Sequence, residues 1–181
     1  ENLKRNLLLF TQIKDLNIPT ILVINMSDRM RRKGISIDTH KMEQLLHAKV
    51  VLVSARKNEG IDTLKEHIAN YKTISTSSCV SIEQIDTEYF ESLRRTFPKQ
   101  SLYKLWLVIT QDVNFANVER KKMEAQDASH IRSASFLKRL QQKETIKRYQ
   151  FINSVLKECY VKDIDKATDL RSKLDRVLTH R

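Results

Sequence analysis

The sequence predicts a predominantly helical chain in two parts, an α/β part with parallel strands and an all-helical part that follows it. Two apolar runs, residues 20–25 and 50–53, lack polar alternation, which is typical of parallel strands buried on both faces. A helix-sized segment separates them, as in a doubly wound sheet. The segment 74–81 is rich in serine and threonine, and no convincing strand follows it. We therefore expect domains at residues 1–73 and 82–181, joined by a linker at 74–81.

The first part is expected to alternate helices with the two strands. Apolar residues recur at helical spacing over residues 3–16 and predict an amphipathic helix. A short helix at 28–33 should end at Gly34, and Asp38 should cap a helix that runs to about residue 47. Gly60 opens a further helix after the second strand. The inner face of that helix is expected to consist of Ile61, Leu64 and Ile68.

The second part is expected to contain helices only. The helical patterns cover residues 82–95, 102–110, 113–123, 130–160 and 164–178. The longest of them carries an apolar stripe, which we expect to face a core. The stripe consists of Leu137, Leu140, Tyr149, Ile152 and Leu156.

Composition limits the function classes. A formal net charge of +11 invites a nucleic-acid interpretation, but the charge is spread over the chain and aromatic residues do not alternate with the basic clusters. A basic face that lies against anionic lipid explains the charge more economically than nucleic-acid binding does. The two cysteines and five histidines lack the spacing of a disulfide framework or a zinc site, so we expect no metal ligands. No apolar run is long enough to cross a bilayer.

Polar residues follow both predicted strands. The first strand runs into Asn25-Met26-Ser27-Asp28, and the second into Ser54-Ala55-Arg56. The Asp28 carboxylate can accept two hydrogen bonds from the ring N–H and the exocyclic amine of guanine, a contact that adenine cannot make. Asn25 fits the companion role of bonding the base and bracing the loop, and the amide of Ala55 can donate to the guanine oxygen.

Each motif alone has a simpler interpretation. An Asn-x-x-Asp after a strand is usually a turn or a helix cap, because both side chains bond nearby backbone groups. Two such strands in the right order, each ending in the right residues, favour the guanine-reading half of a GTPase. Parallel strands also bring their carboxyl ends to one edge of the sheet, where ligands bind.

The phosphate-binding half of such a site is absent from this sequence. A phosphate loop needs a glycine-rich segment that ends in Lys and Ser or Thr, whereas the chain has only Gly34 and Gly60. An Asp-x-x-Gly motif for the magnesium side is also missing. We therefore name no catalytic residue and expect the chain by itself neither to bind GTP tightly nor to hydrolyse it.

Several segments resemble the cytoplasmic part of the prokaryotic ferrous iron transport protein B (FeoB) family. The similarity covers nearly all of the chain and is most specific in the first part and at the C-terminal end. The matching segments are Val23-Ile-Asn-Met-Ser-Asp28, Lys33-Gly-Ile-Ser-Ile-Asp38, Ser54-Ala-Arg56, Glu59-Gly-Ile-Asp-Thr-Leu64, Glu144-Thr-Ile-Lys-Arg-Tyr149 and Leu170-Arg-Ser-Lys-Leu-Asp-Arg-Val-Leu-Thr-His180.

The resemblance implies an α/β remnant of a P-loop GTPase G domain followed by an all-α helical domain that leads toward a membrane segment. It implies a GTP-regulated ferrous iron transporter at the cytoplasmic face of the bacterial inner membrane, with GTP or GDP and Mg²⁺ as ligands of the complete G domain. The transmembrane iron permease domain would be its partner. Met26 stands where most GTPases place a lysine that stacks on the base. The implied guanine-binding residues are Asn25, Met26, Asp28, Ser54, Ala55 and Arg56.

A second hypothesis makes the chain an interaction module, in which the helical domain docks onto other subunits or the membrane face and the G-domain remnant is passive. The missing strands of the G domain also predict an unpaired parallel edge, which a second copy of the chain could cover in a homo-oligomer. Nucleic acid is not expected as a partner.

Overall fold

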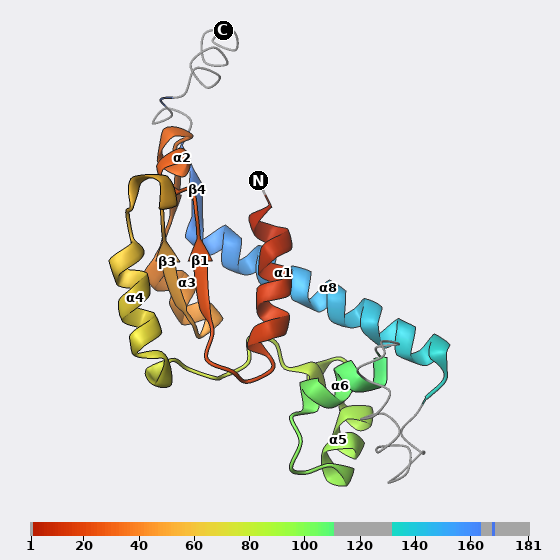
Figure 1. Ribbon diagram of the computed structural model, residues 1–181. Coiled ribbons are helices and arrows are strands. Elements are labelled where there is room, and N and C mark those ends of the chain that lie inside the picture. The colour runs from red at the N-terminus through yellow and green to blue at the C-terminus, as the bar shows by residue number, and fades with distance from the viewer. Residues whose placement is uncertain (1, 111–131, 164–167, 169–181) are drawn as a thin grey trace, which may run out of the picture. The chain divides into compact units, whose positions relative to one another are not determined.

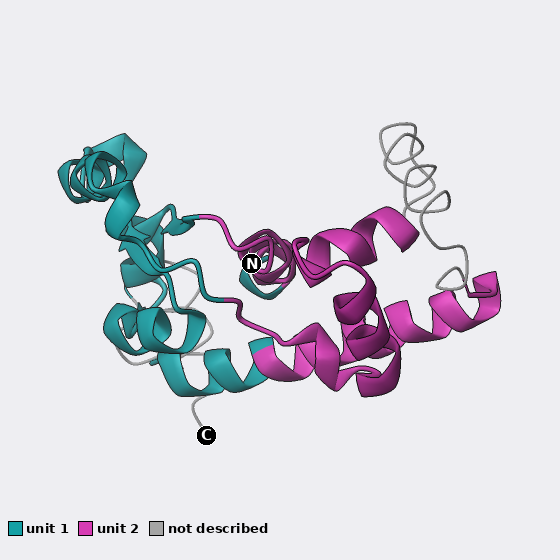
Figure 2. Cartoon of the chain, turned by 90° about the horizontal axis from the view of Figure 1, so that it is seen from below, with its two compact units in different colours: residues 1–4, 19–77, 152–181 teal, residues 5–18, 78–151 magenta. Residues whose placement is uncertain are grey.

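The computed structural model describes residues 2–110, 132–163 and 168, and it divides into two compact units (Figure 2). The chain passes from unit 1 to unit 2 after residue 4 and again after Ser77. Helix α8, Ala134–Cys159, begins in unit 2 and ends in unit 1. The predicted domain division at 1–73, 74–81 and 82–181 stays a prediction. Unit 1 contains residues 1–4, 19–77 and 152–181, and unit 2 contains residues 5–18 and 78–151.

Unit 1 contains a parallel pair of strands. Strand β1, Ile21–Ile24, pairs with β3, Lys49–Leu52, so that Leu22 lies opposite Val50. Helices α3, Thr39–Leu46, and α4, Ile61–Ala69, contact β3 (Figure 1). The two apolar runs thus form the parallel strands that the sequence predicts.

Local capping residues set the helix ends in unit 1. Helix α2, Ser27–Arg32, is followed by Gly34, whose φ of +67° ends the helical backbone. The Asp38 carboxylate accepts a hydrogen bond from the Lys41 amide at 2.9 Å and so caps α3. Both predictions are confirmed.

The inner face predicted for α4 is wrong at Ile68, its last residue. Ile68 is 55% exposed, and no residue of α4 is fully buried. Ile61 and Leu64 are half-buried. The apolar spacing is correct for a helix, but it did not tell how deeply each apolar residue would be buried.

Gly60 lets the chain turn from the β3 loop into α4. Its φ is +75°, and a Cβ atom there would lie 2.2 Å from the Leu52 carbonyl oxygen. We expect Gly60→Ala to lower the free energy of unfolding by at least about 1–3 kcal/mol, because the left-handed backbone and the backbone clash both disfavour a side chain. Urea denaturation of the chain measures this loss. Asn58→Ala is the control, since Asn58 also has a positive φ and is exposed; an equal loss in both variants would rule out the close approach as the cause.

Two short strands were not predicted. Strand β2, Ile35–Ile37, pairs antiparallel with β4, Tyr160–Lys162. The expectation that no strand follows the linker is therefore wrong for residues 160–162. Three residues are too few for a period-2 pattern, and the pairing joins segments that lie far apart in the sequence. The Asp38 amide also donates to the Cys159 carbonyl oxygen at 2.9 Å, and Lys41 pairs with Glu158.

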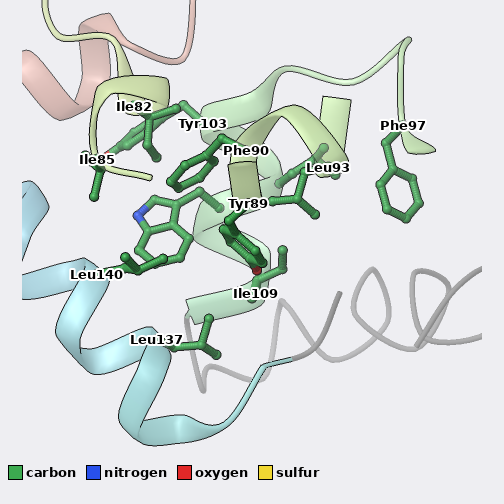
Figure 3. Close-up of a cluster of buried hydrophobic side chains, with 12 residues drawn as sticks. Ile82, Ile85, Tyr89, Phe90, Leu93, Phe97, Tyr103, Ile109, Leu137 and Leu140 are labelled. Atoms are coloured by element: carbon green, nitrogen blue, oxygen red, sulfur yellow. The ribbon is translucent and has the colours of Figure 1, made fainter. Parts of the chain in front are cut away.

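Unit 2 is helical and has an aromatic core. It contains most of α1, Leu3–Lys14, together with α5, Thr87–Thr96, and α6, Leu102–Thr110. The Phe90 ring packs edge to face on Trp106, with centroids 5.4 Å apart. Leu140 of α8 reaches this cluster (Figure 3), as its place in the predicted stripe requires. The helices predicted at 113–123 and 164–178 lie outside the described residues.

Unit 2 also buries a cluster of charged side chains. Arg148 is 1% exposed; its Nη1 donates to Asp15 Oδ2 at 2.7 Å and its Nε to Glu144 Oε1 at 2.8 Å. The indole of Trp106 donates to the other Glu144 oxygen at 2.7 Å, and the Arg148 guanidinium lies over the Tyr103 ring. Burial acts to lower the pKa of Arg148, but Tyr103, Asp15 and Glu144 raise it overall. The arginine therefore stays charged inside the core.

Within the described residues, no helix combines the length and the apolar composition that a membrane span requires.

Candidate functional site

Backbone hydrogen bonds join the loops that follow β1 and β3. The Val53 amide donates to the Ile24 carbonyl oxygen at 2.9 Å, and the Ser27 amide donates to the Val53 carbonyl oxygen at 2.9 Å. These bonds continue the parallel pairing beyond the ends of the strands. Asn25 to Asp28 therefore lie beside Ser54 to Arg56, as the meeting of parallel strand ends predicts.

Asp28 is the centre of this site. It lies in the first turn of α2 and is 7% exposed. Its Oδ1 accepts a hydrogen bond from Ser54 Oγ at 3.0 Å, and its Oδ2 accepts one from Arg56 Nη2 at 3.0 Å. Arg32 Nη1 lies 3.5 Å from the same Oδ2. The structure thus holds the carboxylate in one orientation.

The Asp28 carboxyl is held in its charged form. Burial acts to raise its pKa, but the hydrogen bonds from Ser54, the Arg29 amide and Arg56 outweigh burial, and the pKa lies below its ordinary value. The site therefore presents an anionic acceptor throughout the physiological pH range. Such an acceptor forms stronger hydrogen bonds than a neutral one.

Asn25 links the two loops. Its Oδ1 accepts from the Met26 amide at 2.7 Å and from the Ala55 amide at 3.3 Å. The bracing role predicted for Asn25 is thus visible as a contact. The Ala55 amide, for which we expected a bond to the guanine oxygen, points to Asn25 in this structure, through a hydrogen bond near the upper limit of length.

Met26 borders the site. It has a left-handed backbone, with φ of 65°, and its side chain is 55% exposed. A residue other than glycine with this φ is uncommon and is found mostly where surrounding contacts enforce it. Here the bond from the Met26 amide to Asn25 and the bond from the Arg29 amide to the Met26 carbonyl oxygen fix the turn.

The loop after Ser54 is closed on itself. The Ser54 and Glu59 backbones exchange two hydrogen bonds, of 3.0 and 3.2 Å, around the short 3₁₀ turn Ala55–Lys57. Arg31 of α2 forms an ion pair with Glu59. Sequence reasoning missed the ion pairs of Arg31 and Arg32, because a basic residue on a short helix gives no sign of its partner.

The arrangement suits a planar ligand edge with two neighbouring N–H donors. All six predicted residues come together here: Asn25, Met26, Asp28, Ser54, Ala55 and Arg56. Over the described ranges, no three His, Cys, Asp or Glu side chains gather as metal ligands would. The groups that meet around Asp28 are hydrogen-bond donors and acceptors.

Comparison with solved structures identifies the fold. The cytosolic domain of the T. maritima FeoB iron transporter in its GMPPNP form matches with a TM-score of 0.75 at 18% identity, over 88% of this chain and 64% of that one. The cytosolic domain of L. pneumophila FeoB matches with a TM-score of 0.65 at 26% identity, over 88% and 64%. The fold is therefore that of FeoB cytosolic G domains, mostly helical with a small parallel sheet.

Sequence comparison gives the same family. The Fe(2+) transporter FeoB of Legionella pneumophila (strain Paris) is 28% identical over 99% of this chain. The chain spans only 24% of that relative's length. The family described as ferrous iron transport protein B matches residues 1–68, which include the whole site around Asp28. The sequence and structure comparisons therefore both relate this chain to the ferrous iron transport protein B family.

Proposed function

We propose that this chain is the guanine-reading and helical part of a GTP-binding ferrous iron transporter, located at the cytoplasmic face of the bacterial inner membrane. The match of residues 1–68 to this family and the similarity to its relatives support iron transport as the function of the whole protein. The T. maritima FeoB cytosolic domain has been solved in GDP and GMPPNP forms, which supports a guanine nucleotide as ligand. The transmembrane permease domain is the proposed partner.

The main support for this proposal is the geometry around Asp28. Its carboxylate is ionised, oriented by Ser54 and placed at the carboxyl end of a parallel strand pair. Guanine offers a ring N–H and an exocyclic amine side by side, and these two donors match the two carboxylate oxygens. Adenine places an acceptor beside its amine, so that one contact would become a repulsion.

The remaining guanine contacts come from the neighbouring groups. The Ala55 amide can donate to the guanine oxygen if it gives up its 3.3 Å bond to Asn25. Asn25 can then use its own amide for the base. The exposed Met26 side chain is available to cover one face of the ring. Each of these residues binds or orients the base, and none takes part in hydrolysis.

Hydrolysis and metal binding belong to groups that this sequence does not contain. The nucleotide phosphates and Mg²⁺ would be held by a phosphate loop and its companion motifs. Bound Mg²⁺ would neutralise charge on the phosphates. By itself the chain is proposed to be inactive, since base contacts without phosphate contacts forgo most of the charged interactions that hold a nucleotide.

Contacts within unit 1 support coupling between the base site and the C-terminal segment. Helix α2, which carries Asp28, leads directly into β2, and β2 pairs with β4. The Asp163 amide donates to the Gly34 carbonyl oxygen at 2.8 Å, and the Thr168 amide donates to the Arg32 carbonyl oxygen at 2.8 Å. A shift of α2 on nucleotide binding would thus move the segment proposed to lead toward the membrane.

Base selectivity of the natural full-length protein tests the proposal. We expect GDP to bind roughly 10- to 100-fold more tightly than IDP, because inosine lacks the exocyclic amine and a hydrogen bond to a charged group contributes about 1.5–3 kcal/mol. ADP should bind more weakly still. Calorimetric titration with the three diphosphates measures the order. Equal affinity for GDP and IDP would exclude Asp28 as the guanine-reading residue.

A further inference from the structure

Arg56 occupies one of the two oxygens that guanine needs. Its Nη2 lies 3.0 Å from Asp28 Oδ2, while Ser54 holds Oδ1. The Arg56 side chain is 70% exposed, whereas the Asp28 side chain is 8% exposed. A buried carboxylate with little free surface is thus covered by an arginine that comes from the solvent side.

The chemistry of the two donors is closely similar. A guanidinium is a carbon atom bonded to three nitrogens, with N–H groups in one plane. The N–H edge of guanine has the same carbon bonded to three nitrogens, carrying its amine beside the ring N–H. Arg56 therefore presents to Asp28 the same kind of donor that the base presents.

We propose that Arg56 acts as an internal substitute for the base, covering the guanine-reading carboxylate of Asp28 until a guanine nucleotide displaces it. This inference rests on the proposed function of the site. Arg56 is a specificity-determining residue on this view. A base that offers two N–H donors replaces the lost ion pair, and a base that offers fewer leaves Asp28 poorly paired.

The alternative is that Arg56 orients Asp28 and remains in place when the base binds. The surroundings of Asp28 argue against it. Ser54 already fixes Oδ1, and the Arg32 guanidinium lies 3.5 Å from Oδ2 on the same helix. The carboxylate thus keeps an orienting contact on each oxygen after Arg56 has moved. With Arg56 still bound to Oδ2, the exocyclic amine of guanine would have to share an oxygen that two arginines already contact.

The two readings predict opposite signs for one substitution. A nucleotide that has to displace an exposed ion pair binds about two- to fivefold more weakly than one that does not. Arg56→Gln in the natural full-length protein should therefore bind GDP roughly two- to fivefold more tightly than the unchanged protein. The orienting reading predicts weaker binding. Calorimetric titration with GDP gives the affinities, and circular dichroism checks that the variant is folded.

Lys57→Gln is the matched control. Lys57 follows Arg56 in the same 3₁₀ turn and is also exposed, so this variant removes the same charge from the same loop. Loss of a positive charge should by itself weaken binding of an anionic nucleotide. Tighter GDP binding by Arg56→Gln together with unchanged or weaker binding by Lys57→Gln would assign the effect to the Asp28 contact.

A double substitution completes the test. In an Asp28→Asn background, which should favour xanthosine diphosphate (XDP), the ion pair no longer exists, so adding Arg56→Gln should change the affinity for XDP only as much as Lys57→Gln does. Equal or weaker GDP binding by the single variant Arg56→Gln, in a protein that still prefers GDP over ADP, would overturn this inference alone. A natural protein without preference for GDP would overturn the proposed function instead.

Discussion

Replacing Arg148 by methionine is expected to lower the free energy of unfolding of the chain by about 3–5 kcal/mol, because two buried carboxylates lose their common partner. Asp15 is 2% exposed and Glu144 7% exposed. Each accepts a short hydrogen bond from the Arg148 guanidinium. Methionine fills a similar volume, so the loss reports the unpaired charges rather than a large cavity.

The single tryptophan makes this prediction measurable. Trp106 lies in the same unit, is 1% exposed and donates to Glu144. Urea denaturation followed by its fluorescence therefore reports unfolding of the region that Arg148 stabilises. Lys143→Met is the matched control, since Lys143 is an exposed residue of the same helix and receives the same side chain. Its effect should stay within about 0.5 kcal/mol, and a similar loss in both variants would contradict the argument.

The loss caused by Arg148→Met should shrink as the pH falls. Burial already raises the pKa of Asp15 above its ordinary value, and Arg148 and the amides of Cys79 and Val80 act in the opposite direction. Without the arginine this pKa rises further. A carboxyl whose folded-state pKa exceeds its unfolded value binds more protons in the folded state, so the variant loses stability as the pH rises through the folded-state pKa. Denaturation of both proteins at pH 4 and pH 8 tests whether the loss is smaller at the lower pH.

Local signals in the sequence predicted most of the fold. The strands β1 and β3 and the cap at Asp38 were predicted because the apolar run or the capping side chain lies inside the element itself. The pairing of β2 with β4 could not be predicted, since three-residue strands carry no periodicity and their partners are far apart in the chain. The exposed Ile68 shows a related limit, because a helical pattern does not tell how much surface its neighbours offer.

The partners of the charged residues could not be predicted from the sequence. Arg148 stands in a helix rich in charged residues, where an arginine is usually solvated, and only the fold brings Asp15 to it. At the candidate site, Asp28 and Ser54 were predicted to meet because both follow the ends of neighbouring parallel strands. The ion pair between Arg56 and Asp28 was not predicted. The motif gave Arg56 a place at the site but did not indicate which atom its side chain would contact.

Asp28→Asn in the natural full-length protein is expected to reverse base preference from guanine to xanthine. The asparagine amide keeps one acceptor and replaces the other with a donor. It therefore faces the guanine amine with an NH₂ group, whereas the 2-oxygen of xanthine accepts from that same group. Loss of a hydrogen bond to a charged acceptor, about 1.5–3 kcal/mol, predicts at least a 10- to 100-fold weaker affinity for GDP.

The measurement compares GDP with XDP in both proteins. XDP should bind the Asp28→Asn variant more tightly than it binds the unchanged protein, since the electrostatic conflict between Asp28 and the xanthine oxygen is removed. The asparagine oxygen can still accept from Ser54 Oγ, so the loop after β3 should keep its place. Asp38→Asn is the matched control, because the same change at an exposed helix cap leaves a capping acceptor. GDP affinity that stays the same in the Asp28 variant, or XDP affinity that does not rise, would show that Asp28 does not read the base.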